Sequence, residues 1–280
     1  MLVKYKDLNN YNLKSNNCFY TIAEIGINHS GSLEKAKKLV ESAAKANVNA
    51  VKFQTYKAEN RVGKDSPLYD ILKDCELSFI EFEKIKRTAE DNGVTFFSTP
   101  FDEESVKFLK SINCEIFKIA SFDSSNKKLI KIISSISKTS ILSTGLTNLE
   151  ELNQAYDILN KNNNKVVLLH CVSSYPTKPI DSNLQKIHTL QKNFDCLIGQ
   201  SDHTDDILIP LFAAAKGAQV IEKHFKIDNE MQCPDAIVSI TQEQMKNLND
   251  NLDILFDALG SEKIKIHSAE KDILQFKRFS

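Results

Sequence analysis

Short apolar runs recur along the sequence, and each is followed by a longer segment in which apolar residues repeat every three or four positions. Short runs rich in β-branched and aromatic residues predict strands, and the longer segments predict amphipathic helices. We expect strands at Tyr20–Ile25, Ala50–Phe53, Thr95–Ser98, Ile116–Ile119, Ser140–Ser143, Val166–His170, Cys196–Ile198 and Gln219–Glu222.

Helices are expected between these strands and after the last one. Ser32 and Asn148 precede two of the helical segments and are suitable N-caps, while Asn92-Gly93 and Gly217 are suitable stops. The predicted helices are Ser32–Ala46, Ser78–Asn92, Glu103–Ile112, Lys127–Ser137, Leu149–Asn160, Asp181–Asn193, Asp205–Lys216 and Gln242–Leu259.

Strict alternation of strands and helices predicts the α/β class, with a single (β/α)₈ TIM barrel over residues 20–265. The alternative is a doubly wound sheet, which usually carries Gly-x-Gly-x-x-Gly after its first strand; the sequence has no such motif. Residues 1–19 are expected to form an N-terminal arm or hairpin. Two long connections, Tyr56–Leu77 and Lys226–Ile240, are expected to be structureless and functional.

Composition excludes several classes of partner. The 280 residues are 41% hydrophobic and 26% charged with a net charge of −1, so bulk charge indicates neither nucleic acid nor an acidic membrane surface as a partner. We find no apolar stretch of membrane-spanning length and expect no secretory signal. The six cysteines include no Cys-x-x-Cys pair, which predicts reduced, mostly buried thiols and a cytoplasmic protein.

Histidines and lysines gather where the predicted strands end. In a barrel these ends face one shared site. Four of the six histidines lie there, namely His29, His170, His203 and His224. A single such histidine is more often structural than a ligand, but four on one rim weaken that interpretation.

Lys52 and Lys118 lie inside strand patterns. Lysine is almost never fully buried without a partner, so we expect both to point into a pocket that holds an anion.

This inventory suggests a chemistry. Two cations with several hydroxyls suit a small molecule that carries a phosphate and a carboxylate, although each Ser or Thr alone is more often a cap or turn residue. Two imidazoles, His203 and His224, suit a divalent metal acting as a Lewis acid, with water and substrate completing its shell. Glu24 is a candidate for proton transfer.

An ordered set of motifs carries a resemblance to a known family. The motifs are Ile22-Ala23-Glu24-Ile25-Gly26-Ile27-Asn28-His29-Ser30-Gly31, Val51-Lys52-Phe53-Gln54-Thr55, Ser98-Thr99-Pro100-Phe101, Phe117-Lys118-Ile119-Ala120-Ser121, Leu142-Ser143-Thr144-Gly145, Leu169-His170-Cys171, Tyr175-Pro176-Thr177, Ser201-Asp202-His203-Thr204 and Glu222-Lys223-His224-Phe225. Together they resemble the N-acetylneuraminate (sialic acid) synthases and their pseudaminic and legionaminic acid relatives.

The resemblance implies an enzyme, a transferase that condenses phosphoenolpyruvate with an N-acetylated hexose such as N-acetylmannosamine and releases phosphate. It implies Mn²⁺, with Mg²⁺ or Co²⁺ as alternatives, on His203 and His224, and Glu24 as the proton-transfer residue. Phosphoenolpyruvate would be bound by Lys52, Thr99, Lys118, Ser121, Ser143 and Ser201, with Ser173 nearby. Tyr175 and Asp235 would contact the sugar. Asn28 and Gln54, at the ends of the first two strands, join the predicted substrate-binding residues.

The sequence also departs from the family. Cys233-Pro234-Asp235 replaces Gly-Pro-Asp, Phe122-Asp123 replaces the Gly-Glu of the sialic acid branch, and Ser173 stands where Asn is frequent. Family members continue into an antifreeze-like domain whose arginine reaches the sugar site of a swapped dimer partner. Residues 266–280 resemble the start of the linker to that domain, so we expect a sugar site without that arginine.

Two other functions fit part of the pattern. One is another phosphoenolpyruvate-dependent aldolase with the same barrel, which would need a further basic cluster for its acceptor's phosphate. The other is a barrel that binds a sugar or a protein without turnover. A homodimer is also expected, because barrel faces can pair.

Overall fold

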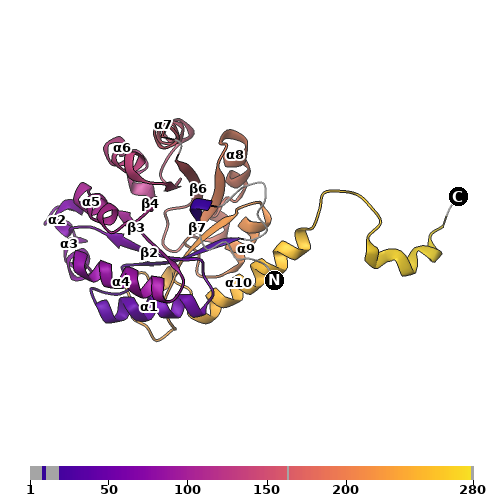
Figure 1. Ribbon diagram of the computed structural model, residues 1–280, viewed down its shortest axis with the longest axis horizontal. Helices are drawn as coiled ribbons and strands as arrows, with labels where there is room; N and C mark the ends of the chain where they lie inside the picture. Colours follow the sequence, from indigo (N-terminus) through magenta and orange to yellow (C-terminus); the bar gives the residue numbers. More distant parts are fainter. Residues whose placement is uncertain (1–7, 11–18, 163, 279–280) are drawn as a thin grey trace.

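The computed structural model describes residues 8–10, 19–162 and 164–278 and contains a closed barrel of parallel strands (Figure 1). The strands follow one another around the ring in chain order, and the last pairs with the first. They are β1 (Tyr20–Gly26), β2 (Ala50–Thr55), β3 (Thr95–Pro100), β4 (Ile116–Ile119), β5 (Thr139–Ser143), β6 (Lys165–Cys171), β7 (Leu197–Asp202) and β8 (Val220–His224).

Helices surround the ring of strands. They are α1 (Leu33–Lys45), α2 (Ala58–Arg61), α3 (Tyr69–Asp74), α4 (Phe79–Asp91), α5 (Glu103–Ser111), α6 (Lys127–Ile136), α7 (Leu149–Asn160), α8 (Gln185–Asn193), α9 (Leu208–Ala215) and α10 (Gln242–Leu259). The predicted (β/α)₈ barrel is therefore confirmed. Two predicted caps also hold: Ser32 accepts a hydrogen bond from the amide of Lys35, and Asn148 forms a capping box with Glu151.

Several strands extend further than the sequence predicts. The predicted Cys196–Ile198 is β7, which ends at Asp202, and the predicted Gln219–Glu222 is β8, which ends at His224. Apart from Gly199, both extensions consist of buried polar residues. Hydrophobic periodicity places a boundary where polarity begins, but here the polar residues continue the strand and line a cavity.

Two helices begin later than expected. The segment predicted from Asp181 starts with a 3₁₀ turn, Pro179–Asp181, and α8 begins only at Gln185, because Asn183 adopts the left-handed conformation with φ of 46°. Helix α9 begins at Leu208 rather than Asp205.

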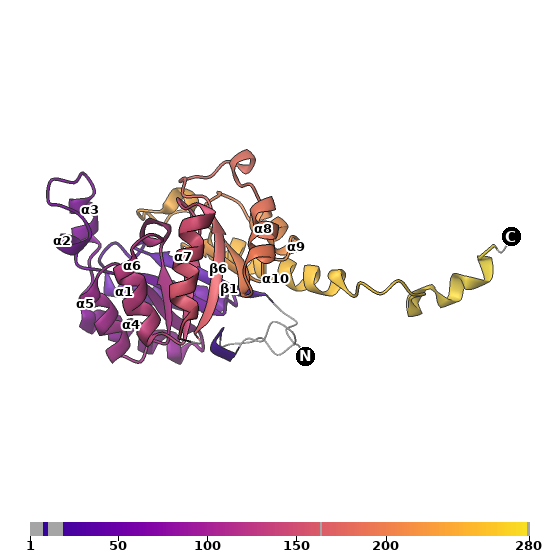
Figure 2. The same ribbon diagram turned by 90° about the horizontal axis from the view of Figure 1, so that it is seen from above.

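The connection from Tyr56 to Leu77 is not structureless, contrary to expectation. It contains α2 and α3, which lie at the edge of the ring (upper left of Figure 2), and a small apolar core of Ile27, Tyr56, Ala58, Leu72 and Cys75. The Tyr56 hydroxyl donates to the Leu72 carbonyl at 2.9 Å, and the Glu76 carboxylate accepts from the Ala58 amide at 2.9 Å. The segment therefore has a defined shape.

The amino-terminal end of the barrel is closed by a 3₁₀ turn, η1 (Leu8–Asn10). Leu8 is fully buried in the main core, and the Asn9 side chain bridges Glu115, which precedes β4, and Thr139, the first residue of β5. The rest of the predicted 1–19 arm, apart from Phe19, lies outside the described residues.

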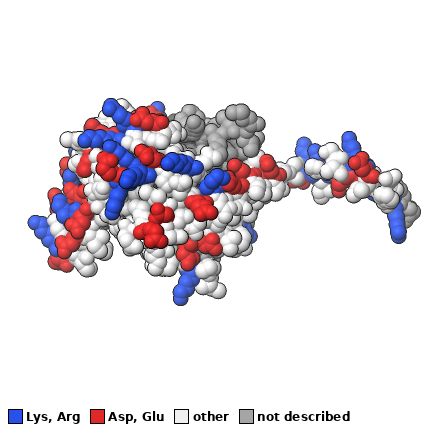
Figure 3. All heavy atoms as spheres, turned by 90° about the horizontal axis from the view of Figure 1, so that it is seen from below, with Lys and Arg blue, Asp and Glu red and all other residues white. Residues whose placement is uncertain are grey.

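After α10 the chain leaves the barrel and ends in an exposed 3₁₀ segment, η5 (Ser268–Phe276) (Figures 1 and 2). Within the described ranges, no helix has the length and apolar character needed to cross a bilayer. The five cysteines of those ranges are free thiols, as expected. Basic and acidic side chains are both spread over the face shown in Figure 3.

Gly199 tests the packing of the barrel wall. A Cβ at this β7 position would lie 2.2 Å from the Val220 carbonyl oxygen and 2.6 Å from Leu169, and the first of these is backbone of a paired strand. Gly199→Ala should therefore lower the free energy of unfolding, measured by urea titration, by about 3 kcal/mol. Gly63→Ala is the control, since its Cβ would meet only the exposed Asp65 side chain, and should change stability by less than about 0.5 kcal/mol. Equal effects of the two variants would contradict this packing.

Candidate functional site

A cavity of about 360 Å³ opens at the carboxyl ends of the strands. Its size is typical of a site for a small molecule. It is lined by Glu24, Ile27, Lys52, Gln54, Arg61, Leu68, Thr99, Phe101, Lys118, Ala120, Ser121, Phe122, Ser143, Cys171, Tyr175, Ser201, His203, Glu222, His224 and Asp235. Of the predicted site residues, Asn28 and Ser173 are absent from this lining.

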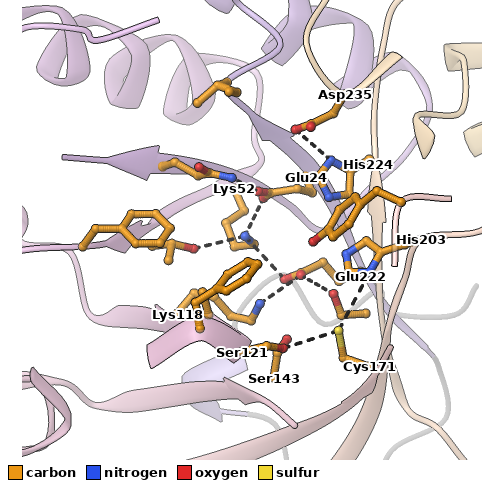
Figure 4. A pocket seen from close by; sticks show the side chains of 18 of the residues that line it. Glu24, Lys52, Lys118, Ser121, Ser143, Cys171, His203, Glu222, His224 and Asp235 are labelled. Carbon is orange, nitrogen blue, oxygen red and sulfur yellow. Dashed lines mark hydrogen bonds and ion pairs between the residues drawn. The ribbon is translucent and has the colours of Figure 1, made fainter. Parts of the chain in front are cut away.

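Four buried charges form the floor of the cavity (Figure 4). Lys52 Nζ lies 2.6 Å from Glu24 Oε2 and 3.8 Å from Glu222 Oε2, and Lys118 Nζ lies 3.0 Å from Glu222 Oε1. Lys52 also donates to the Thr99 hydroxyl at 3.1 Å. All four charged residues are at most 4% exposed. The two lysines therefore have protein carboxylates as partners even without a ligand. The sequence predicted only a bound anion as their partner.

The two carboxylates of the floor are electrostatically unequal. Burial raises the pKa of Glu24, and the attraction of Lys52 only partly offsets it. Burial also opposes the charge of Glu222, but Lys118 and Lys52 together lower its pKa to about 2. Burial lowers the pKa of Lys118, while Glu222 and Glu24 outweigh burial at Lys52 and raise its pKa. Carboxylates whose pKa values are pushed apart suit different roles: Glu24 can take up a proton, and Glu222 stays ionised.

Hydroxyl groups border this floor. Ser201 donates to Glu222 Oε1 at 2.8 Å, and the Ser121 hydroxyl accepts from the Gly145 amide at 3.1 Å. The buried hydroxyls of Ser143 and Ser173 have no partner among the described residues. Ser173 is not a lining residue, but a Cβ on Gly145 would meet its hydroxyl at 2.5 Å and that of Ser121 at 2.7 Å. Unpaired buried hydroxyls are costly, so these groups are available to a bound anion.

Two imidazoles lie beside the floor. The ring centroids of His203 and His224 are 5.3 Å apart, and Tyr175 packs 4.1 Å from the first and 6.0 Å from the second. His203 Nδ1 donates to the Val172 carbonyl at 2.8 Å, which leaves Nε2 as the free nitrogen. His224 Nδ1 lies 3.4 Å from Asp235 Oδ2. Burial opposes the charge of Asp235, but His224 lowers its pKa overall.

This pair fits a metal ion held by two imidazoles. A carbonyl or carboxylate on the second ring nitrogen is the usual support of a ligating histidine. In the part of the chain that the structure describes, no three His, Cys, Asp or Glu side chains converge as a metal-binding group. The protein would thus supply two ligands and leave the remaining positions to water and substrate.

Asn28 supports the site from behind. Its amide donates to the Phe225 carbonyl and the Ser239 hydroxyl, each at 2.9 Å, and its carbonyl accepts from the Asp235 amide at 2.9 Å. It joins the chain after β1 to the chain after β8, and so fixes the backbone that carries Asp235.

The other two strand-end histidines are structural neighbours of the site. His29 is buried against Phe53, with ring centroids 5.9 Å apart, and His170 Nε2 donates to the Ser182 carbonyl at 2.7 Å. Neither lines the cavity.

Sequence reasoning left three polar residues out of the site. Glu222 could have been predicted to face the site, because residues two apart in a strand face the same side and His224 is two positions further along. Cys171 is the last residue of β6, and its Sγ lies 3.9 Å from His203 Nδ1. Nothing in the sequence around this thiol predicts that it faces the site. Arg61 lies in the long connection after β2, where no periodicity predicts the direction of a side chain.

Known proteins resemble this chain over most of its length. The NeuB family model matches residues 39–264. The uncharacterized protein MJ1065 of Methanocaldococcus jannaschii is 41% identical over 91% of this chain and 76% of the relative. The N,N'-diacetyllegionaminic acid synthase of Legionella pneumophila is 38% identical over 87% of this chain and 74% of the relative.

Solved structures agree. The N-acetylneuraminic acid (sialic acid) synthetase of Leptospira borgpetersenii, in complex with citrate, matches with a TM-score of 0.89 and 37% identity over 94% of this chain and 92% of that one. A truncated 3-deoxy-D-arabino-heptulosonate 7-phosphate synthase of Thermotoga maritima is only 18% identical with a TM-score of 0.71, so it shares the fold. The resemblance drawn from the motifs is thereby confirmed.

His29 makes the stability of the barrel depend on pH. Burial lowers its pKa from 6.5 to about 4, so between these values the unfolded chain binds more protons than the folded one. Stability should therefore fall as the pH falls through this window, by about 3 kcal/mol from this residue. His29→Asn can keep an acceptor for the Gly31 amide. Between pH 7 and 4 its free energy of unfolding should fall by about 3 kcal/mol less than that of the wild type, measured by urea titration without added metal.

His188→Asn is the matched control, because His188 is exposed on α8. It should show the same pH dependence as the wild type. If the wild type and His29→Asn lose the same stability on acidification, the burial of a neutral His29 is refuted.

Proposed function

This chain belongs to the NeuB family, and we propose that it condenses phosphoenolpyruvate with an N-acetylated hexose to form a nonulosonic, sialic-type acid with release of phosphate. Relatives named as synthases of legionaminic, pseudaminic and N-acetylneuraminic acids support this proposal. The observation that carries it is the buried floor of two lysines and two carboxylates beside two imidazoles.

The floor suits phosphoenolpyruvate because of its charge balance. Lys52 and Lys118 contribute +2 and Glu24 and Glu222 contribute −2, so the four groups sum to zero while all are ionised. A proton on Glu24, whose pKa burial raises, leaves the floor at +1. An anionic substrate would then meet a net positive floor rather than a neutral one.

We assign the anionic groups of phosphoenolpyruvate to this floor. Lys52 and Lys118 would bind the carboxylate and phosphate as charged donors. The hydroxyls of Thr99, Ser121, Ser143, Ser173 and Ser201 would add neutral donors, and two of them are unpartnered and buried in the described structure. Gln54 borders the same region, with its amide 3.5 Å from Glu24 Oε1.

The imidazole pair would hold a divalent cation, for which Mn²⁺ is proposed and Mg²⁺ or Co²⁺ are alternatives. Bound at His203 and His224, it would act as a Lewis acid toward the aldehyde oxygen of the open-chain sugar. The protein prepares this position through the Val172 carbonyl and Asp235, which orient the two rings.

Glu24 is the proposed proton-transfer residue. It is held by Lys52, and burial raises its pKa, which makes a proton on this carboxylate less costly. In the overall reaction, the C2=C3 π electrons of phosphoenolpyruvate form a bond from C3 to the aldehyde carbon, whose oxygen takes a proton. Water adds at C2 and loses a proton, and the C2–O bond to phosphate breaks as the keto group forms. Tyr175 and Asp235, at the cavity wall, would orient the sugar through its hydroxyls. We also propose a cytoplasmic location, where free thiols persist, and a homodimer.

Phosphate release tests the proposal directly. The full chain should release phosphate from phosphoenolpyruvate when Mn²⁺ and an N-acetylhexosamine are both present, and a panel of these sugars identifies the acceptor. Chelation should stop the release, and His203→Ala or His224→Ala should reduce it to background while circular dichroism shows an intact fold. His188→Ala, on the exposed face of α8, should retain full activity.

Each negative outcome has a distinct meaning. Absence of phosphate release with every acceptor contradicts the proposed reaction. Full activity after chelation, or in both histidine variants, contradicts the metal assignment alone.

Lys118 tests the anion site separately from turnover. Lys118→Met removes one of two cations from the floor and should weaken phosphoenolpyruvate binding, measured by calorimetry, by about 2–5 kcal/mol, because a buried anion would lose a charged partner. Lys178→Met is the control, since Lys178 is exposed in the connection between β6 and α8. Unchanged affinity in Lys118→Met would remove this residue from the substrate site.

A further inference from the structure

One section of the cavity wall has no part in the reaction proposed above. It includes the guanidinium of Arg61, which lies over the ring of Phe101, and the same lining carries the apolar side chains of Ile27 and Leu68. Leu68 is 55% exposed, so the surface it offers is accessible to a ligand. A cation among apolar side chains at a substrate cavity calls for a chemical explanation.

The guanidinium is held on both its face and its edge. Its Cζ atom lies 3.8 Å from the ring centroid of Phe101 and 4.7 Å from that of Tyr56. Nη1 donates to Gln54 Oε1 at 2.9 Å. No carboxylate oxygen of the described residues lies within the 4.0 Å of an ion pair, and no other hydrogen bond of this guanidinium is formed there. Four of its five N–H donors thus have no partner among the described residues.

The segment that carries Arg61 is itself fixed. Its helix α2 is tied to α3 through the small core around Tyr56 and to Glu76 through the Ala58 amide. The donors of Arg61 are consequently oriented before a ligand arrives, which lowers the entropy lost on binding.

An acetamido group matches this wall. Such a group needs a donor for its carbonyl oxygen and an apolar surface for its methyl group; Arg61 offers the first, and Leu68 and Phe101 offer the second. A second phosphate fits less well, because the negative charges of Asp123 and Asp235 act on Arg61 and would repel a dianion. The other two cations of the lining, Lys52 and Lys118, are paired with the carboxylates of the floor.

We propose that Arg61, with Leu68 and Phe101, forms a subsite that recognises an acetamido group of the acceptor sugar. This inference rests on the proposed function for the identity of the sugar class. It makes Arg61 a specificity-determining residue that contacts the acceptor and leaves phosphoenolpyruvate untouched.

The test compares two sugars on matched variants. N-acetylmannosamine and mannose differ only at C2, where one has an acetamido group and the other a hydroxyl. Dissociation constants for both are measured by ligand-observed NMR titration in the presence of phosphoenolpyruvate without metal, and KM values are measured in the phosphate-release assay. Arg61→Met keeps a long apolar stem and removes the donors.

The matched control is Lys57→Met. Lys57 is a cation beside the same helix that lies over the Phe79 ring at 4.9 Å and pairs with Glu76, outside the cavity lining. Arg61→Met should reduce the preference for N-acetylmannosamine over mannose by about 10–100-fold, as expected for hydrogen bonds to a charged donor. In Arg61→Met, the mannose affinity and the KM for phosphoenolpyruvate should stay within about twofold of the wild-type values. Lys57→Met should match the wild type in all these measurements.

Three results would overturn the subsite: a preference retained in Arg61→Met, an equal loss for both sugars, or a raised KM for phosphoenolpyruvate. Absence of sugar binding to the wild type would overturn it as well. If no phosphate is released by the wild type but the acetamido preference depends on Arg61, the proposed reaction is wrong and the subsite stands.

Discussion

The balance of four buried charges is the constraint on which the site depends. Lys52, Lys118, Glu24 and Glu222 lie among packed strands, where an unpaired charge is far more costly than in water. Each lysine is therefore paired with a carboxylate, and removal of one group leaves its partner as an unpaired buried charge, which destabilises the fold. The same arrangement divides the carboxylates, because Glu222 faces both lysines and stays ionised while Glu24 can carry a proton. Charge compensation and the proposed proton transfer thus arise from one set of contacts.

Closure of the barrel creates this set. In the strand register Glu24 pairs with Lys52 on β2 and with His224 on β8, so β1 joins the second and eighth strands at the level of the cavity. Glu24 and His224, 200 positions apart in sequence, become neighbours only because β8 returns to β1. The same closure lets Asn28 hold the backbone of Asp235. The turn that seals the opposite end with Leu8 and the glycine that lets β7 approach β8 support the site indirectly, because both preserve the ring.

Much of this arrangement could be predicted from the sequence, and the failures have physical causes. Alternating apolar runs and amphipathic segments predict the barrel, and polar residues at strand ends predict the rim. The same polarity made β7 and β8 seem shorter than they are, because a pattern of burial cannot distinguish a polar lining from a loop. Glu222 was predicted to lie in a strand but was not paired with Lys118, since pairing across the ring depends on register. Arg61 could not be found at all, because short helices in a long connection orient side chains by packing that no local pattern records.

We propose that Glu24 takes up a proton when phosphoenolpyruvate occupies the floor. Calorimetry of phosphoenolpyruvate binding at pH 8, without metal and in buffers of different ionisation enthalpy, measures the protons exchanged on binding. We expect net proton uptake by the wild type and its loss in Glu24→Gln, because the amide cannot titrate. No uptake by the wild type, or equal uptake by Glu24→Gln, would contradict the assignment of the proton to Glu24.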